Sequence, residues 1–197
     1  MKHLTLIAIL VFSFSIKLLS QERDRSSIYI KELSSEGIKL DKGWTFFPGD
    51  NPDYAKYYYA DERGIPVNPT LVLGQLPLVR RAGIGWFRLK FEIDSSLRDK
   101  TIGMMISQFG ATEIYLNGEL ILRLGKVSKN YKEEKTQAIY AHAVNLKLGA
   151  GKEQLLAVRY SYNQQNMYRY GFTVPPCFRI VLRPSNENIN KMALMAK

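Results

Sequence analysis

The sequence predicts an all-β protein of 197 residues whose strands form a single β-sandwich. Three observations predict this class: apolar and polar residues alternate in several short segments, an Asn-Gly pair interrupts one of them, and glycines and prolines separate the others. Alternation with a period of two is typical of strands with one buried face, and Asn-Gly supplies the turn of a tight hairpin. Turn residues at a spacing of roughly 8 to 12 residues favour a sandwich.

The clearest alternation lies between Trp86 and Ile93. The predicted core face of this strand carries Phe87, Leu89, Phe91 and Ile93, and the opposite face carries Trp86, Arg88, Lys90 and Glu92. Similar alternation over residues 102–106, 156–160 and 178–182 predicts three further strands of the same kind.

The segment from Glu113 to Ile121 predicts a β-hairpin, because Asn117 and Gly118 tolerate the positive φ angles that a type I′ turn requires. Residues 54–85, with several tyrosines and prolines, and residues 125–137, with clustered charges, predict long loops. A short helical turn is expected within residues 51–60. No segment beyond the first twenty residues carries a sustained helical period.

The first twenty residues are typical of a secretory signal peptide, with a basic start, an apolar block and Ser20 before a polar segment. The block is shorter than the ~20 apolar residues that span a bilayer, so cleavage is expected and an uncleaved anchor is the alternative. We predict an exported protein, periplasmic or extracellular, with no transmembrane span in the mature chain. The predicted domains are a signal peptide (1–20), an N-terminal lead-in (21–37), a β-sandwich domain (38–184) and a tail or linker (185–197).

The chain carries a formal net charge of +10, which falls to +8 when Lys2 and Lys17 are removed with the signal. A basic surface attracts anionic partners such as nucleic acid, lipid head groups or acidic polysaccharide. Nucleic acid is the partner least available to an exported protein, and the sequence carries no nucleic-acid-binding motif. The lone cysteine, Cys177, is expected to act as a small buried apolar residue.

Residues suited to catalysis are scarce. His142 is the only histidine after the signal, and no Cys and His spacing of a zinc site occurs. The acidic pairs Asp61-Glu62 and Glu133-Glu134 are expected to be solvated loop residues. A glycine-rich phosphate loop is also lacking from the sequence. We therefore predict a protein that is not an enzyme and needs no cofactor.

Three aspartates offer a candidate site for a structural calcium ion: Asp41, Asp50 and Asp53. Carboxylate oxygens are ligands that Ca²⁺ prefers, but the spacing is not that of an EF-hand loop. A turn rich in Asp and Asn is the commoner explanation of this segment.

A binding surface is expected where aromatic rings and planar polar groups meet, because sugars stack on rings and take directed polar contacts. The candidate ligand-binding residues are Tyr58, Trp86, Arg88, Tyr115, Tyr168, Arg169 and Tyr170. For Trp86 and Tyr115 the alternative is a second packing layer of the sandwich, since large aromatic side chains are often buried.

Four motifs carry a resemblance to a known family: Gly43-Trp44-Thr45-Phe46, Pro48-Gly49-Asp50, Gly83-Ile84-Gly85-Trp86-Phe87-Arg88 and Glu113-Ile114-Tyr115-Leu116-Asn117-Gly118. Together they resemble the exported N-terminal sensor domains of bacterial membrane signalling proteins, which precede histidine kinase, SpoIIE-like phosphatase or cyclase modules. More distantly, the chain is similar to the N-terminal sugar-binding domain of the β-galactosidase and β-glucuronidase family. The resemblance covers roughly residues 38–183.

The resemblance implies a galactose-binding-like jelly roll that binds its ligand with loops at one end, here the loops near 50–62, 126–137 and 162–172. It also implies that Trp86, Arg88, Asn117 and Gly118 serve the architecture. The expected function is a non-catalytic ligand-sensing or interaction domain that acts with a membrane-bound signalling partner. The alternatives are a secreted carbohydrate-binding module and the sugar-binding-like accessory domain of a glycoside hydrolase.

Overall fold

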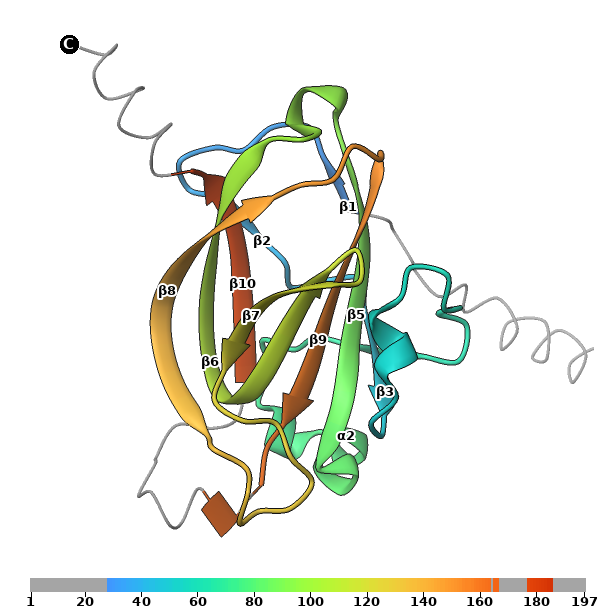
Figure 1. The fold of residues 1–197 in the computed structure, drawn as a ribbon, viewed down its shortest axis with the longest axis vertical. Helices are drawn as coiled ribbons and strands as arrows, with labels where there is room; N and C mark the ends of the chain where they lie inside the picture. Colours follow the sequence, from blue (N-terminus) through green and yellow to red (C-terminus); the bar gives the residue numbers. More distant parts are fainter. Residues whose placement is uncertain (1–27, 164, 167–176, 186–197) are drawn as a thin grey trace, which may run out of the picture.

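The computed structural model describes residues 28–163, 165–166 and 177–185 (Figure 1). The predicted signal peptide, most of the predicted tail, and the candidate residues Tyr168, Arg169 and Tyr170 lie outside these ranges. No helix in the described part of the chain is long and apolar enough to cross a membrane. The predicted lead-in includes one short strand, which pairs with the sandwich.

The described strands form one curled sheet that folds into two layers, sheets A and B, as the predicted sandwich requires, and β6 continues from one layer into the other. Sheet A consists of β1 (Ile28–Ile30), β3 (Trp44–Pro48), β4 (Ile65–Val67), β5 (Ile84–Ile93), β7 (Glu119–Leu124), β9 (Glu153–Ser161) and the second part of β6 (Thr101–Leu116). Sheet B consists of β2 (Ile38–Lys39), β8 (Gln137–Lys147), β10 (Cys177–Pro184) and the first part of β6. The pairing is antiparallel except between β1 and β5.

The core lies between the two sheets and contains the predicted alternating face of β5. Phe87, Leu89, Phe91 and Ile93 are all at most 1% exposed, which confirms the period-two prediction. From sheet B, Phe178 packs edge-on against Phe87 with ring centroids 4.9 Å apart. Burial of each such side chain stabilises the fold by roughly 1.5–3 kcal/mol.

The predicted hairpin is present between β6 and β7. Asn117 and Gly118 have φ angles of 51° and 90°, the positive values that the turn requires. The Asn117 amide also joins the turn to β9, because its Oδ1 accepts a hydrogen bond from the Leu155 N–H and its Nδ2 donates to Gln154. Asn117 is therefore an architectural residue, as the resemblance implies.

Strand β6 is a single strand of 16 residues rather than two separate strands. It leaves sheet B and enters sheet A at Gly110, whose φ is 144°. A Cβ atom at this position would lie 2.6 Å from the Tyr160 ring, whose hydroxyl donates to the Phe109 carbonyl. Glycine thus lets β6 bend across the core edge while Tyr160 packs against it.

Short helices occur in the described chain: η1 (Pro52–Ala55), η2 (Leu73–Gln75), α2 (Pro77–Ala82) and η3 (Ser95–Leu97). The predicted long loop at residues 54–85 contains η2, α2 and the strand β4. Helix η1 lies within the expected helical turn at residues 51–60, where the Asn51 side chain accepts a hydrogen bond from the Asp53 N–H. The sequence analysis did not predict α2. This helix begins at Pro77 and ends at Ala82, and the following Gly83 has a φ of 66°. Six residues are too few to show a helical period.

Candidate ligand-binding site

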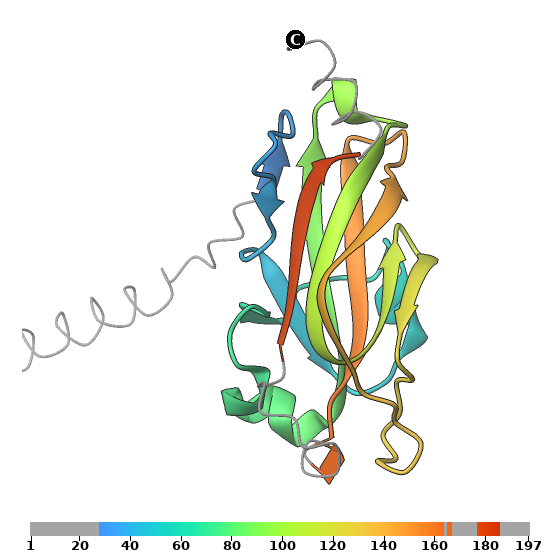
Figure 2. The ribbon, with the colours of Figure 1, turned by 90° about the vertical axis from the view of Figure 1, so that its left-hand side faces the viewer.

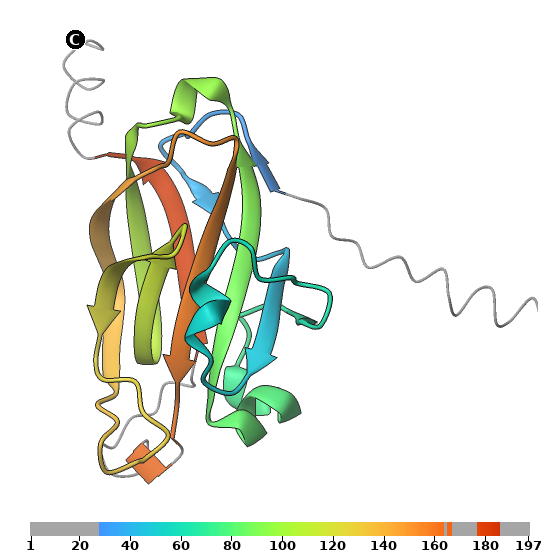
Figure 3. The same cartoon turned by 45° about the vertical axis from the view of Figure 1, so that its right-hand side comes forward.

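Two of the predicted ligand-binding residues, Trp86 and Arg88, lie on the outer face of sheet A and contact the segment that contains η1. Figure 3 shows this segment lying over sheet A. Each is only 1% exposed. The Trp86 ring packs near the rings of Tyr54 and Tyr115, at centroid distances of 6.3 and 5.3 Å. This is the second packing layer that the sequence left as the alternative.

The Arg88 guanidinium fixes the covering segment to the sheet. Its Nε donates to the Asp61 carboxylate over 2.6 Å, and Nη2 donates to the Tyr59 carbonyl over 3.0 Å. Its Nη1 donates to the carbonyls of Lys56 and Tyr54. Buried carbonyls need such donors, so Arg88 organises the segment. We therefore assign Trp86 and Arg88 to the architecture and leave them out of the ligand surface.

Tyr115 belongs to a neighbouring polar cluster on sheet A. Its hydroxyl donates to Glu113 over 2.9 Å, and burial followed by this hydrogen bond raises the pKa of Tyr115 to about 12. Arg159 joins the same carboxylate over 3.0 Å and binds both oxygens of Asp50 over 2.7 Å. The hydrogen bond from Arg159 lowers the pKa of Asp50. Every charge in this cluster faces an opposite charge.

Tyr58 is the one predicted ligand-binding residue within the described ranges that is open to solvent, at 77% exposure. The three aspartates of the calcium hypothesis are not brought together. Asp50 is engaged by Arg159, whereas Asp41 lines a hollow beside β3. Within the part of the chain that the structure describes, no three His, Cys, Asp or Glu side chains form a group that could hold a metal ion.

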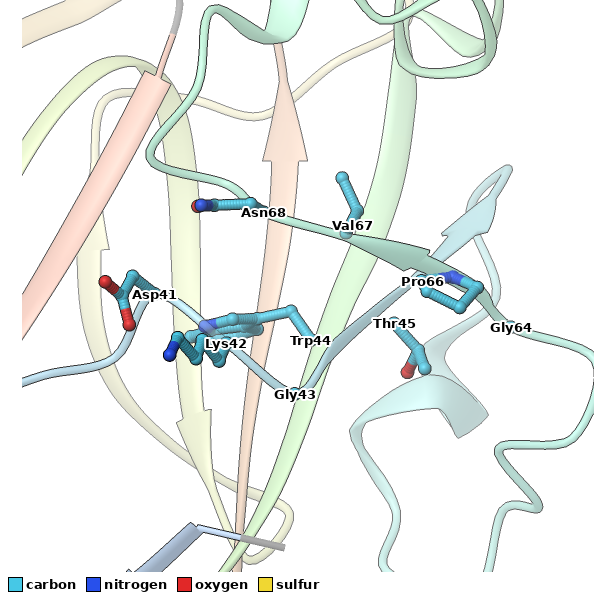
Figure 4. Close-up of a pocket in the computed structure, with 9 residues that line it drawn as sticks. All are labelled: Asp41, Lys42, Gly43, Trp44, Thr45, Gly64, Pro66, Val67 and Asn68. Carbon is cyan, nitrogen blue, oxygen red and sulfur yellow. The ribbon is translucent and has the colours of Figure 1, made fainter. Parts of the chain in front are cut away.

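Among the described residues, that hollow is the best candidate site for a small ligand (Figure 4). It has a volume of about 380 Å³, and it is lined by Asp41, Lys42, Gly43, Trp44, Thr45, Gly64, Pro66, Val67 and Asn68. The antiparallel pairing of β3 with β4 brings the two halves of the lining together. Volumes of roughly 300–1,000 Å³, with apolar walls and a few polar groups, are typical of small-molecule sites.

Polar groups of both kinds converge on the hollow. Figure 4 shows the polar ends of Asp41, Lys42 and Asn68 on the same side of it. The Asn68 Oδ1 accepts hydrogen bonds from the N–H and hydroxyl of Thr70, so its Nδ2 is the group that Asn68 can offer to a ligand. Trp44 forms part of the wall, held by a 2.8 Å hydrogen bond from its indole N–H to the Leu40 carbonyl. One acceptor and two donors beside an apolar wall suit a ligand rich in hydroxyl groups.

The structure corrects the expectation that both acidic pairs are solvated. In the first pair, the Asp61 side chain is only 15% exposed and binds Arg88. In the second pair, Glu133 is solvated, as expected, but Glu134 is only 2% exposed and its Oε1 accepts from the Thr136 hydroxyl. Asn166 packs against the same loop, where its Nδ2 donates to the Tyr131 and Glu134 carbonyls. A one-turn bend after Asn130 turns the two neighbouring carboxylates to different sides. Nothing in their sequence separates the two.

Comparison with solved structures identifies the same fold in part of a bacterial glycosidase. A glycosyl hydrolase family 2 member from Bacteroides cellulosilyticus matches 73% of this chain with a TM-score of 0.50 and 18% identity. This similarity establishes the fold. The Bacteroides uniformis β-glucuronidase matches 75% of this chain (TM-score 0.48, 16% identity), and the Bifidobacterium dentium β-glucuronidase matches 80% (TM-score 0.45, 12% identity).

The chain spans only part of these enzymes: 20% of the Bacteroides cellulosilyticus chain, 18% of the Bacteroides uniformis chain and 32% of the Bifidobacterium dentium chain. Its sequence matches no protein-family model and no curated protein. The all-β sandwich predicted from the sequence is confirmed, whereas the resemblance to sensor domains stays a prediction.

Proposed function

We propose that the chain is a non-catalytic carbohydrate-binding domain of the accessory kind found in glycoside hydrolases. The observation that carries this proposal is the hollow beside β3 and β4, whose size and lining suit a sugar ring. The likeness in fold to a family 2 glycosyl hydrolase supports it. Because one fold hosts many functions, the site rather than the fold carries the argument.

A sugar in this hollow would use each polar group according to its chemistry. Asp41 accepts a hydrogen bond from a ring hydroxyl, while Lys42 and the Asn68 Nδ2 donate to hydroxyl or ring oxygens. Pro66 and Val67 form the apolar wall for the carbon face of the ring, and Trp44, which is 1% exposed, supports this wall from the core. All three polar groups are at the surface, so binding is expected to be weak and fast.

A thermal-shift screen against neutral and acidic monosaccharides and oligosaccharides tests the proposal. A ligand at about 100 times its Kd raises the free energy of unfolding by about 2.7 kcal/mol, which is a shift of several degrees. We expect Asp41→Ala and Asn68→Ala to remove the shift, and Asp53→Ala, an exposed aspartate outside the hollow, to retain it. A shift that survives both hollow variants would place the site elsewhere.

The second candidate function is the ligand-sensing domain of an exported receptor, which rests on the four motifs. In that case the chain would bind a membrane-bound signalling partner as well as a ligand. Co-purification of the chain with a membrane protein from its own host would favour sensing. Hydrolysis of nitrophenyl glycosides by the purified chain, lost in a variant of one of its carboxylates, would contradict the non-catalytic part of both proposals.

A further inference from the structure

The strand segments of sheet B carry positive charge and no acidic residue. The four strand segments of this sheet contain Lys39, Lys147, Arg179 and Arg183, and none of their residues is Asp or Glu. None of these four side chains takes part in an ion pair or side-chain hydrogen bond within residues 28–163, 165–166 and 177–185. The Nε of Arg183 is buried without a partner.

Strand register places three of these cations side by side. On β10, Phe178, Ile180 and Leu182 face the core, so Arg179, Val181 and Arg183 face outward. Lys39 on β2 pairs with Val181 and therefore lies between the two arginines. At about 3.3 Å per residue, neighbouring cations stand roughly 7–8 Å apart along this edge. Like charges this close repel, and an anion across them removes the repulsion.

The face is hollowed over β6, near the C-terminal end of β10. A depression of about 200 Å³ is lined by Gly103, Met105, Ala143, Asn145, Arg183 and Pro184. Gly37 lies beneath the Arg183 side chain, since a Cβ there would come within 2.6 Å of the arginine Cγ. In Figure 2 this face is turned to the viewer, and no described helix or loop crosses β10, β6 and β8.

An exposed aromatic ring completes the face on β8. Tyr140 is 72% exposed, and its neighbour Ile139 packs against the core, so Tyr140 faces outward. The next residue, Ala141, donates its N–H to Ser107, and Ser107 pairs with Arg179 across β6. Only β6 therefore separates the Tyr140 ring on β8 from Arg179 on β10. Rings of this kind stack on sugar faces.

We propose that the outer face of sheet B is a binding surface for an extended acidic polysaccharide, with carboxylate or sulfate groups on Arg179, Lys39 and Arg183 and a sugar ring on Tyr140. Guanidinium forks match carboxylate and sulfate oxygens, and a shallow depression beside Arg183 admits a flat chain. The surface uses none of the residues that line the hollow beside β3, so the two binding proposals fail separately. The exported location predicted from the sequence makes a polysaccharide a more available polyanion than nucleic acid.

Binding of the purified chain to polygalacturonate and dextran sulfate, with neutral dextran as comparison, tests the proposal in affinity gels and by calorimetry. We expect the acidic polymers to bind and to be released at an ionic strength on the order of 0.3 M, because screening shortens the reach of exposed charges. The double variant Arg179→Glu/Arg183→Glu is expected to bind about tenfold or more weakly. The matched control Lys56→Glu/Lys129→Glu, with the same change of net charge elsewhere, should bind as the unaltered chain does.

Tyr140→Ala separates a glycan surface from a general polyanion surface. We expect it to weaken binding of polygalacturonate several-fold and to leave binding of double-stranded DNA unchanged. Absence of binding to both acidic polymers, or equal loss in the Lys56/Lys129 control, would overturn the proposal. Tighter binding to DNA, or to phosphatidylglycerol vesicles, than to polygalacturonate would also overturn it and assign the face to that other partner.

Discussion

The two outer faces of the sandwich hold their cations in opposite situations. On sheet A, Arg88, Lys90 and Arg159 each contact a carboxylate, and the segment around η1 covers the face. On sheet B, Arg179 and Arg183 have no such partner within the described chain, and the face is open. A paired, covered arginine stabilises the fold, whereas an unpaired arginine on an open strand does not. Substitutions at the two kinds of position should therefore differ sharply.

The largest effect is expected from Arg88→Met on sheet A. Removal of the guanidinium leaves the Asp61 carboxylate and the carbonyls of Lys56 and Tyr59 without their donor. Loss of one partner of a buried ion pair costs about 3–5 kcal/mol, and urea unfolding measures it. The matched variant Arg179→Met on sheet B should change the free energy of unfolding by no more than about 0.5 kcal/mol. Equal effects at the two positions would remove the contrast between the faces.

The next effect concerns the strand that joins the two faces. Gly110→Ala places a Cβ where φ is 144° and where the Tyr160 ring is 2.6 Å away. Strain and overpacking together are expected to lower the free energy of unfolding by about 2–3 kcal/mol, which urea unfolding measures. Gly151→Ala is the control, because the atom nearest to its added Cβ lies 3.5 Å away. An unchanged urea midpoint for Gly110→Ala would mean that β6 can bend there without glycine.

The sequence predicted the parts of this fold that rest on local pattern. The alternation around Phe87 and the Asn117-Gly118 turn were sufficient because burial of one strand face and positive φ are properties of adjacent residues. The passage of β6 between sheets was missed, because alternation is lost where residues 108–112 are all buried. Burial on both sides there depends on strands β8, β9 and β10, which are distant in sequence.

The candidate sites were harder to predict for the same reason. The hollow joins residues 41–45 to residues 64–68, and only the pairing of β3 with β4 brings them together. The cationic face of sheet B becomes visible only when the strand order shows that its four strand segments lack acidic residues. Conversely, Trp86 and Arg88 stood out in the sequence as candidate ligand-binding residues. In the structure they hold the segment at residues 50–61 against sheet A.

A smaller effect, dependent on pH, is expected at the exposed margin of sheet A. The Arg159 hydrogen bond lowers the pKa of Asp50, so this contact stabilises the fold above the ordinary aspartate pKa of about 3.9 and the stability is lost as pH falls through the lowered value. The pair is partly exposed, so Arg159→Met should cost only about 0.5–1 kcal/mol at pH 7. The difference between the variant and the unaltered chain should narrow below about pH 4 in urea unfolding at several pH values. A difference that stays constant down to pH 3 would show that packing of the Arg159 stem, and not its charge, stabilises this margin.

The smallest effect on stability is expected from Arg179→Glu on sheet B, and its sign is the informative part. The glutamate would stand diagonally opposite Lys39 and replace repulsion by attraction, so the free energy of unfolding should rise by up to about 0.5 kcal/mol. The gain should shrink in high salt, where these charges are screened. Thermal unfolding at low and high ionic strength measures both effects.

The sign of this effect bears on the proposed binding surface. If replacement of Arg179 by an acid stabilises the protein, Arg179 is not needed for folding, and binding of an anion on this face is the role that we propose for it. If Arg179→Glu instead destabilises the protein by more than about 1 kcal/mol, the arginine supports the fold as Arg88 does, and the contrast between the two faces is lost.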